Sequence, residues 1–428
     1  MIADGDVEDA LIEETLGNSE NYREQEDNPI DTYNAKIDDY AARGLREGEI
    51  SEKQARFISN QQKNPPSHEE EELHLANPQP KYKKHKKDEA GKMLDPVPIR
   101  TITVGSGTPV HRLSELCFKA IQHLVTPEHL PNMSQSTKAV VKRLFFINEN
   151  HTPLSPQSVF AFSDIHNMYP SVDNSEALEI IKDMLENDPS PLGASADYIT
   201  EGLKLCGECN CVQFKEKFYV PCKGCAQGPC HACSFTDIWV SRVVKKHIET
   251  SNIDSVLYSI YRDDGKDILV NGLVDQPAYQ QHLDSLHPNL KWDLTCGKEG
   301  GYLDLFLMIQ DGKIEWKTYT KTPPLYLSRI SCHDPKVLKS IPKGLGYRLR
   351  ITNSRNKTFL ENMELYSRAM ALSGYKYEMV KQELLKFQNI DPLELSKRVK
   401  KRRNSKPGCK AFYVAPFDPR LPHPRKLI

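Results

Sequence analysis

The sequence has 428 residues, enough for two or three domains and a sizeable core. Its formal net charge is −1, but residues 1–29 hold ten acidic side chains and one arginine, which leaves 56 basic against 48 acidic residues in the rest of the chain. An acidic tail on a basic body fits a nucleic-acid partner, with an ordinary solvated surface as the alternative. No apolar run is long enough to form a helix that spans a bilayer.

The N-terminal part is predicted to contain a tail, helices and a linker. Residues 1–30 are expected to be disordered, and their acidic start lacks the pattern of a signal peptide, so we expect an intracellular protein with reduced thiols. Residues 31–157 are predicted to hold polar helices, a Pro- and Glu-rich linker, and the basic run KYKKHKK (81–87). A strand, a Gly-rich turn and a helix beginning near Thr108 follow.

Residues 158–322 alternate between strand and helix patterns. The stretch SVFAFSDIHNMYPSV (158–172) is predicted to be a buried strand that ends in a polar step at Asp164, and HACSFTDIWVSRVVKKHIET is predicted to be helical. YSIYRDDGKDIL (258–269) has two apolar stretches around Asp263, Asp264 and a glycine, which is a hairpin signal. A second hairpin is predicted to turn at Asp311–Gly312.

The C-terminal part is predicted to be mainly helical. Residues 323–404 follow the helical pattern, with a turn at Gly374–Tyr375, and residues 405–428 are Pro-rich and expected to be extended.

Asp164, Asp263 and Asp264 raise the question of a site. Taken alone, the Asp pair can be a solvated turn, but three carboxylates at strand ends in this order can converge on one sheet surface. Mg²⁺ takes oxygen ligands, and a pair of Mg²⁺ ions would relieve the repulsion and could serve the in-line displacement of nucleotidyl transfer.

In this order, the segments resemble motifs A, B and C of reverse transcriptases, and more specifically those of Penelope-like retroelements of animals. The resemblance covers roughly residues 33–428 and is carried by YKKHKK…PIRTI, FSDIHNMYPSV, GCAQGPCHACSFTDIWV, YRDD, LDLFL, SCHDPKVLKSIPKGLGYRLR and CKAFYVAPFDPRLP. It implies an α+β fold of reverse-transcriptase fingers and palm, with an antiparallel palm sheet flanked by helices, followed by a helical, helix-turn-helix-like thumb. It also implies RNA-directed DNA synthesis with an RNA template, a DNA primer and deoxynucleoside triphosphates, in the nucleus and without a membrane partner.

The resemblance also implies roles for individual residues. Asp164, Asp263 and Asp264 would hold two Mg²⁺ ions, for which Mn²⁺ can substitute. Tyr169 would stand against the sugar 2′ carbon and exclude a 2′-OH, with a place in the core as the alternative.

The remaining roles concern the incoming nucleotide. Arg100, assisted by Lys86, would clamp the triphosphate, with a surface ion pair as the alternative for Arg100. Lys298 lies where a general acid could act, although a solvated lysine is the simpler interpretation. The floor beneath base and primer would be formed by Gly224, Gln227 and Gly228.

A cluster of cysteines offers a rival interpretation. The pairs Cys206-x-x-Cys209 and Cys222-x-x-Cys225 resemble a four-thiolate zinc site, which would indicate a binding module. Zinc there would fix the backbone around Gly224, where a nucleotide must slide, so zinc is the less favoured cofactor.

Three features depart from the family pattern. Gly265 follows the Asp pair where an apolar residue is usual, the cysteines around motif B are dense, and no GIY-YIG endonuclease follows the DPRLP block. The second hypothesis is therefore an inactive retroelement remnant that only binds nucleic acid. The oligomeric state is left open.

Overall fold

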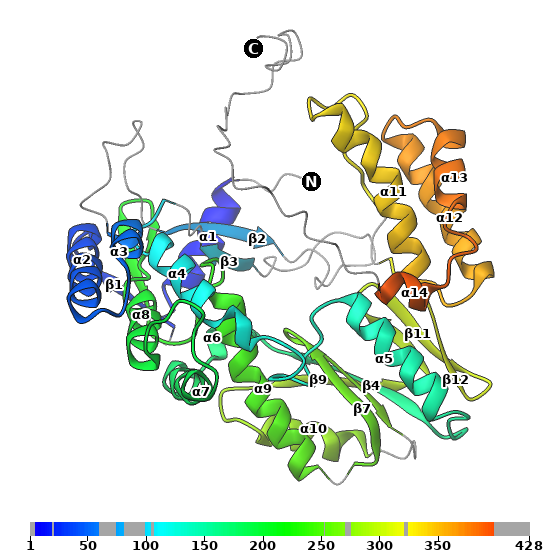
Figure 1. Cartoon of the computed structure of the whole chain (residues 1–428), viewed down its shortest axis with the longest axis horizontal. Helices are drawn as coiled ribbons and strands as arrows, with labels where there is room; N and C mark the ends of the chain where they lie inside the picture. The colour runs from blue at the N-terminus through cyan, green and yellow to red at the C-terminus, as the bar shows by residue number, and fades with distance from the viewer. Residues whose placement is uncertain are drawn as a thin grey trace. The chain divides into compact units, whose positions relative to one another are not determined.

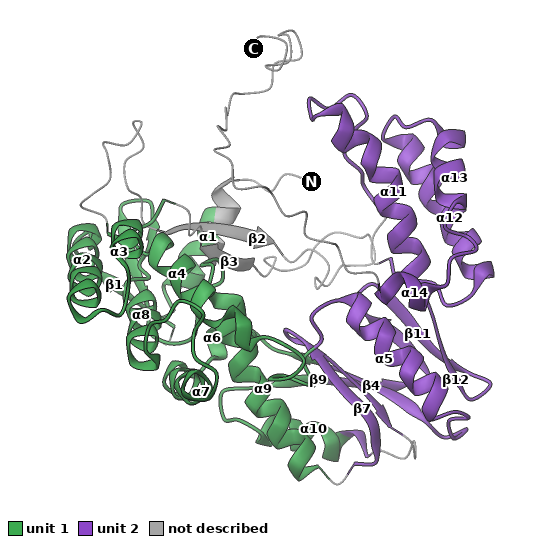
Figure 2. Ribbon diagram, in the orientation of Figure 1, with its two compact units in different colours: residues 1–133, 164–251, 277–293 green, residues 134–163, 252–276, 294–428 purple. Residues whose placement is uncertain are grey.

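The computed structural model describes residues 5–18, 21–59, 74–80, 99–103, 107–251, 253–269, 275–320 and 324–397 (Figure 1). They belong to two compact units (Figure 2). Unit 1 comprises residues 1–133, 164–251 and 277–293, and unit 2 comprises residues 134–163, 252–276 and 294–428. The chain alternates between the units, whereas the sequence predicts consecutive domains. Within the described ranges, no helix combines the length and the apolar character needed to cross a bilayer.

Unit 1 combines a five-stranded sheet with helices. The strand order is β1-β6-β5-β2-β3, in which β2 and β5 are parallel and the other pairs are antiparallel. The strands are β1 (Tyr22–Gln25), β2 (His74–Pro80), β3 (Ile99–Thr103), β5 (Val212–Phe214) and β6 (Lys217–Pro221). The helices are α1 (Gly5–Leu16), α2 (Ile30–Glu47), α3 (Glu52–Ile58), α4 (His111–Ile121), η2 (Gln122–Leu124), α6 (Met168–Ser171), α7 (Asn174–Asn187), α8 (Ala196–Glu208), α9 (Ala232–Thr250) and α10 (Gln276–Ser285).

The acidic N-terminal segment is ordered in its described part, so the prediction of disorder over residues 1–30 is wrong there. It contains α1 and β1, and β1 pairs with β6. Lys215, in the turn between β5 and β6, forms ion pairs with Asp9 at 3.2 Å and with Glu13 at 2.8 Å. The segment shares a small apolar core with this hairpin, made of Ile12, Leu16, Val212 and Tyr219. Distant lysines and apolar residues therefore hold a segment whose composition suggests a solvated tail.

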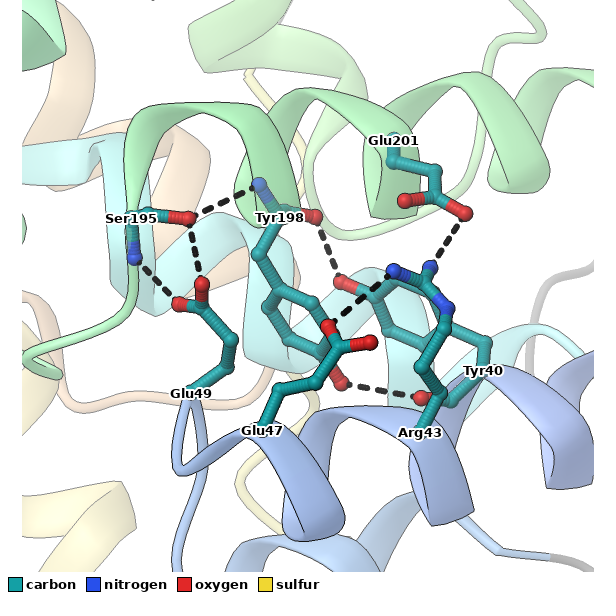
Figure 3. A network of polar contacts seen from close by, with 7 residues as sticks. All are labelled: Tyr40, Arg43, Glu47, Glu49, Ser195, Tyr198 and Glu201. Carbon is teal, nitrogen blue, oxygen red and sulfur yellow. Dashed lines mark hydrogen bonds and ion pairs between the residues drawn. The ribbon is translucent and has the colours of Figure 1, made fainter.

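Helices α2 and α8 are joined by two tyrosines that contact each other's helix (Figure 3). The rings of Tyr40 and Tyr198 stack with centroids 4.3 Å apart, and each hydroxyl donates to the other residue's carbonyl oxygen, at 2.7 and 3.3 Å. A Cβ added to Gly44 would lie 2.2 Å from Tyr198 Oη. One added to Gly202 would lie 2.5 Å from Tyr40 Oη. The two glycines therefore permit this close approach of the helices.

A buried histidine links α9 and α10. His247 Nδ1 lies 3.0 Å from His282 Nε2, and the Tyr279 hydroxyl lies 3.3 Å from His247 Nε2. Burial, and secondarily the neighbouring His282, lowers the pKa of His247 from 6.5 to about 4. The imidazole is therefore neutral in the folded protein at pH 7.

Acid is consequently expected to destabilise unit 1. The unfolded chain protonates His247 below pH 6.5, whereas the folded chain does so only near pH 4. The contribution of this residue to the free energy of unfolding is thus fully present above pH 6.5, and roughly 3 kcal/mol is lost as the pH falls to 4. Urea unfolding between pH 7.5 and 4.5 should show a shallower pH dependence for His247→Gln than for wild type. The same change at exposed His151 is the control, and equal slopes in wild type and His247→Gln would contradict the prediction.

Unit 2 combines two sheets with helices. One sheet has the order β7-β8-β4-β9 and the other the order β10-β11-β12. The strands are β4 (Val159–Ile165), β7 (Ser255–Tyr261), β8 (Asp264–Leu269), β9 (Trp292–Gly297), β10 (Glu299–Tyr302), β11 (Leu305–Gln310) and β12 (Lys313–Thr318). The end of β4, from Asp164, and the start of β9, up to Asp293, belong to unit 1. The helices are α5 (Thr137–Asn150), α11 (Pro335–Ile351), α12 (Asn356–Leu372), α13 (Tyr377–Leu385) and α14 (Pro392–Lys397). One apolar core joins them, and it includes Val140, Phe160, Ile268, Leu307, Trp316, Leu349 and Phe359.

The C-terminal helices of unit 2 follow the sequence prediction. Helices α11 to α14 lie between Pro335 and Lys397, after a non-helical stretch over residues 324–334, and Gly374, at φ 86°, makes the predicted turn between α12 and α13. Buried Asn353 ties these helices to β12, because its Nδ2 donates to Thr318 Oγ1 at 2.8 Å and to the Leu349 carbonyl oxygen at 2.7 Å. The tail predicted for residues 405–428 lies outside the described residues.

Candidate active site

The β7–β8 hairpin carries two of the three predicted carboxylates. Tyr261 and Asp264 lie opposite each other, so Arg262 and Asp263 form a two-residue turn with positive φ (57°) on Arg262. The predicted hairpin is confirmed, but its turn lies at Arg262–Asp263 instead of at the Asp–Gly pair. Asp264 is the first residue of β8, and both carboxylates are half-buried.

Asp164 lies near the end of β4, which is the neighbour of β8 in the sheet. Ser163, the residue before it, faces Gly265, the residue after Asp264, because a Cβ added to Gly265 would lie 2.2 Å from Ser163 Oγ. Successive side chains of a strand point to opposite faces of the sheet. Asp164 and Asp264, the next residue of β4 and the preceding residue of β8, therefore each point to the opposite face of their own strand from Ser163 and Gly265.

The chemistry of this donor set fits Mg²⁺. Mg²⁺ prefers carboxylate oxygens and is typically held by one or two carboxylates together with substrate phosphates. Among the residues that the structure describes, no three His, Cys, Asp or Glu side chains form a group that could hold a metal ion on their own. Carboxylates on neighbouring strands, completed by a triphosphate, match the way in which Mg²⁺ is usually bound.

Gly265 has a packing role beside these carboxylates. It is buried, and an added Cβ would lie 2.2 Å from Ser163 Oγ and 2.9 Å from Tyr258 Oη. Two hydroxyl groups thus occupy the space that an apolar side chain would need. The departure from the family pattern at this position therefore follows from the small spacing between β8 and its neighbours.

Gly265→Ala is expected to lower the free energy of unfolding by about 1–3 kcal/mol, because Ser163 Oγ must give way. Removing that oxygen in the double variant Ser163→Ala/Gly265→Ala should recover most of the loss. Urea unfolding of wild type, both single variants and the double variant measures the coupling free energy between positions 163 and 265. Losses that simply add would show that the two residues do not share this space.

β8 is also less apolar than the sequence pattern indicates. Lys266 is fully buried, lies 5.3 Å from the centre of the Tyr302 ring, and finds no hydrogen-bond partner for its Nζ among the described residues. Burial, and then the charge of Arg143, lowers the pKa of Lys266 from 10.5 to about 7. Because it lies two residues after Asp264, it shares that face of β8. The lysine within the strand pattern was the signal that sequence reasoning missed.

Tyr169 lies on α6, the helical turn that follows β4. Asn167, at φ 45°, precedes this turn, and the Tyr169 carbonyl oxygen accepts a hydrogen bond from Cys225 N at 2.8 Å. The Tyr169 hydroxyl lies 3.4 Å from Cys233 Sγ, in the first turn of α9. The side chain is half-buried, so it is not part of the fully buried core of unit 1.

The predicted floor residues lie on the loop between β6 and α9. Gly224, at φ 78°, sits against Pro170, and an added Cβ would lie 2.5 Å from Pro170 Cα. Asn174 Nδ2 donates to the Gly224 carbonyl oxygen at 2.8 Å. The structure thus brings Gly224 beside the α6 turn. Gln227 is half-buried and Gly228 is exposed further along the same loop.

The structure describes the predicted basic residues to different extents. Arg100 lies in β3, which pairs with β2, but its side chain is outside the description, and Lys86 lies outside the described residues. Lys298 Nζ donates to the carbonyl oxygens of Pro156 and Ser158. Lys298 is exposed and these contacts anchor it within unit 2, which agrees with the simpler interpretation of a solvated lysine.

The four cysteines of the zinc interpretation lie in unlike surroundings. Cys206 and Cys209 are buried at the end of α8, Cys222 is exposed and Cys225 is half-buried on the loop, and all four are free thiols. Burial raises the pKa of Cys206 well above its usual value and that of Cys209 to about 12. Burial thus favours the neutral thiol form of these two side chains.

The fold has relatives among solved structures. No protein-family model matches the sequence, and no curated protein sequence matches it. Telomerase from Candida albicans, in complex with the TWJ fragment of telomeric RNA, is similar over 78% of this chain and 63% of that chain, with a TM-score of 0.51 and 12% identity. Apo telomerase from Candida tropicalis has a TM-score of 0.42 at 13% identity, over 85% of this chain and 68% of that chain. The RNA-dependent RNA polymerase of a human picobirnavirus has a TM-score of 0.40 at 11% identity, over 74% of this chain and 55% of that chain.

The likeness to Candida albicans telomerase concerns the fold. This chain spans less than two thirds of the length of that telomerase chain. Mixed strands and helices, with antiparallel hairpins in the sheets and a helical C-terminal part, agree with the predicted α+β class. The chain therefore has an α+β fold similar to that of this telomerase, and the predicted fold class is confirmed.

Proposed function

We propose that the protein is a template-directed nucleotidyltransferase, and more specifically an RNA-directed DNA polymerase of a Penelope-like retroelement. The observation that carries this proposal is the position of Asp164 on β4, next to the strand β8 whose hairpin holds Asp263 and Asp264. The telomerase-like fold supports polymerase chemistry in general. The sequence motifs support an RNA template, a DNA primer, deoxynucleoside triphosphates and a nuclear location.

The three carboxylates would hold two Mg²⁺ ions, and Mn²⁺ can substitute. When bound, such a pair neutralises charge on the attacking and leaving oxygens of an in-line displacement. The protein chain would contribute by positioning the carboxylates. The hydrogen-bonded pairing of β7 with β8 fixes Asp263 and Asp264, and the pairing of β4 with β8 fixes the strand that carries Asp164.

Other residues would act on the nucleotide. Tyr169 would exclude a 2′-OH, and the loop held against α6 would shape the floor beneath the base. The residues proposed for the floor and for the triphosphate are Gly224, Gln227, Gly228, Arg100 and Lys86.

Extension of a labelled DNA primer on an RNA template tests the proposal. Wild-type protein is expected to extend the primer with deoxynucleotides and Mg²⁺, and EDTA or Asp164→Asn is expected to stop extension without preventing binding of the primer–template. Binding without extension at every Mg²⁺ and Mn²⁺ concentration would contradict the proposed polymerase activity. It would favour the second candidate function, that of a remnant that only binds nucleic acid.

One surface of unit 2 favours nucleic-acid binding under either candidate. Helix α11 contains no Asp or Glu, and three lysines spaced by three and four residues lie exposed on its face opposite the core: Lys336, Lys339 and Lys343. They have no acidic partner among the described residues. Unpaired lysines on one helix face suit the phosphates of a duplex.

Changing these three lysines to glutamine is expected to weaken primer–template binding and to lower the slope of log affinity against log salt by about 2–3. Fluorescence anisotropy between 50 and 300 mM KCl would measure the slope. A matched triple variant replaces lysines that pair with a glutamate three or four residues away: Lys204, Lys245 and Lys386. An equal change of slope in both triple variants would show that α11 has no special part in binding.

A further inference from the structure

A cysteine in the first turn of α9 contacts Tyr169, the tyrosine to which we assign sugar selection. Tyr169 Oη and Cys233 Sγ lie 3.4 Å apart, within the range of a hydrogen bond that involves sulfur. The two residues belong to different segments of unit 1, since Tyr169 is on α6 and Cys233 follows the loop that contains Gly224. The contact therefore joins the far end of the ring to a helix that is separate from its own backbone.

The backbone of Tyr169 is also held in place by hydrogen bonding and packing. Its carbonyl oxygen accepts from Cys225 N at 2.8 Å, and the next residue, Pro170, is in close contact with Gly224. Backbone contacts thus set where the side chain starts. The direction of the ring depends in addition on the torsions of the side chain, and the contact of its hydroxyl with Cys233 restricts these torsions.

A residue that excludes a 2′-OH by its bulk works only while its ring stays in place. A tyrosine ring that can swing by even a fraction of its width makes room for an additional hydroxyl group. Cys233 is well suited to hold it, because a thiol is compact and can both donate to and accept from a phenol. It is half-buried, so its contact with the ring is partly shielded from water.

We propose that Cys233 is a specificity-determining positioning residue, whose thiol holds the Tyr169 ring and thereby sets the preference for deoxynucleotides over ribonucleotides. This inference rests on the proposed polymerase function. Cys233 acts through Tyr169 and does not touch the nucleotide, so its loss changes selection more than the rate of the favoured reaction.

A double-mutant cycle tests the inference. Tyr169→Phe removes only the hydroxyl, Cys233→Ala removes only the thiol, and the double variant removes both. The measured quantity is the ratio of kcat/KM for one deoxynucleotide to that for the matching ribonucleotide, in single additions to a primer on an RNA template. Each single variant is expected to lower this ratio by about 3- to 10-fold, the worth of one hydrogen bond. The double variant should lower it no further.

Two further variants separate a positioning role from a general structural one. Cys233→Ser, which keeps a group able to bond to the phenol, is expected to recover at least half of the lost selectivity on a logarithmic scale. Cys222→Ala removes an exposed thiol of the same loop and should leave the ratio unchanged. In Cys222→Ala, kcat for the deoxynucleotide should also stay within about twofold of wild type.

The outcomes are distinct. Wild type that extends no primer would overturn the proposed function, and this inference with it. Wild type that extends and discriminates, combined with an unchanged ratio in Cys233→Ala or with effects that add in the double variant, would overturn this inference alone. An equal loss of deoxynucleotide and ribonucleotide incorporation in Cys233→Ala would assign the thiol a purely structural role, which also overturns it.

Discussion

Replacing Asp263 by asparagine is expected to lower the rate of Mg²⁺-dependent primer extension by about 10³-fold or more. Asparagine has nearly the size of aspartate and the same preference for turns, so the hairpin should fold. The substitution removes the negative charge of a proposed Mg²⁺ ligand in the turn of the β7–β8 hairpin. Single-turnover extension on an RNA template would measure the rate, and urea unfolding of the same protein would establish that its stability is unchanged.

The matched control makes the same chemical change in another hairpin. Asp311 occupies the two-residue turn between β11 and β12 with φ 51°, a backbone conformation that asparagine also adopts readily. Asp311→Asn is expected to extend primers like wild type. If Asp263→Asn stays within tenfold of the wild-type rate at all Mg²⁺ concentrations, Asp263 is not a metal ligand.

Local signals in the sequence were sufficient for several elements of the fold. The Asp311–Gly312 turn has positive φ at both residues, a conformation for which this residue pair is well suited. Gly374 likewise adopts positive φ in the predicted turn between α12 and α13. The order of strand, loop, helix and hairpin around the three aspartates also agrees with the structure, because short-range pattern determines each of these elements.

Other features depend on residues that are distant in sequence and therefore lay beyond local pattern. The N-terminal helix is ordered because its apolar side chains find partners on the β5–β6 hairpin, and nothing within residues 1–30 indicates that hairpin. The need for a glycine at position 265 arises from Ser163 on the neighbouring strand. The burial of Lys266 depends on the ring of Tyr302 and on the fold around it.

Some features of the candidate site could likewise be predicted from the sequence, whereas its contacts between distant residues could not. The motifs predicted which segments form the candidate site. The structure places Asp164 and the hairpin on adjacent strands of one sheet. It also places the Gly224 loop beside Tyr169. The contact of Tyr169 with Cys233 could not be predicted, because it depends on the packing angle of α9 and not on any sequence spacing. The partners of Lys298 could not be predicted either, because the carbonyl oxygens of Pro156 and Ser158 lie about 140 residues earlier in the chain.

Gly202→Ala is expected to lower the free energy of unfolding by about 2–3 kcal/mol, the second large effect that the structure predicts. The added methyl group would lie 2.5 Å from Tyr40 Oη and 3.2 Å from Cys117 Sγ (Figure 3 shows the tyrosine pair). Tyr40 cannot move aside cheaply, because its ring stacks on Tyr198 and its hydroxyl donates to the Tyr198 carbonyl oxygen. The methyl group must therefore separate α8 from α2.

Gly207→Ala in the same helix isolates this packing effect. Both positions are glycines of α8, but Gly207 is exposed and an added Cβ there meets no atom within 4 Å. Alanine favours a helix over glycine by up to about 1 kcal/mol, so Gly207→Ala should be neutral or stabilising. Urea unfolding should then separate the two variants by about 3 kcal/mol, a difference in which helix propensity cancels. Equal stabilities would mean that α2 and α8 can move apart at little cost, and the close contact of Tyr40 with Gly202 would then contribute nothing to holding the N-terminal helices in unit 1.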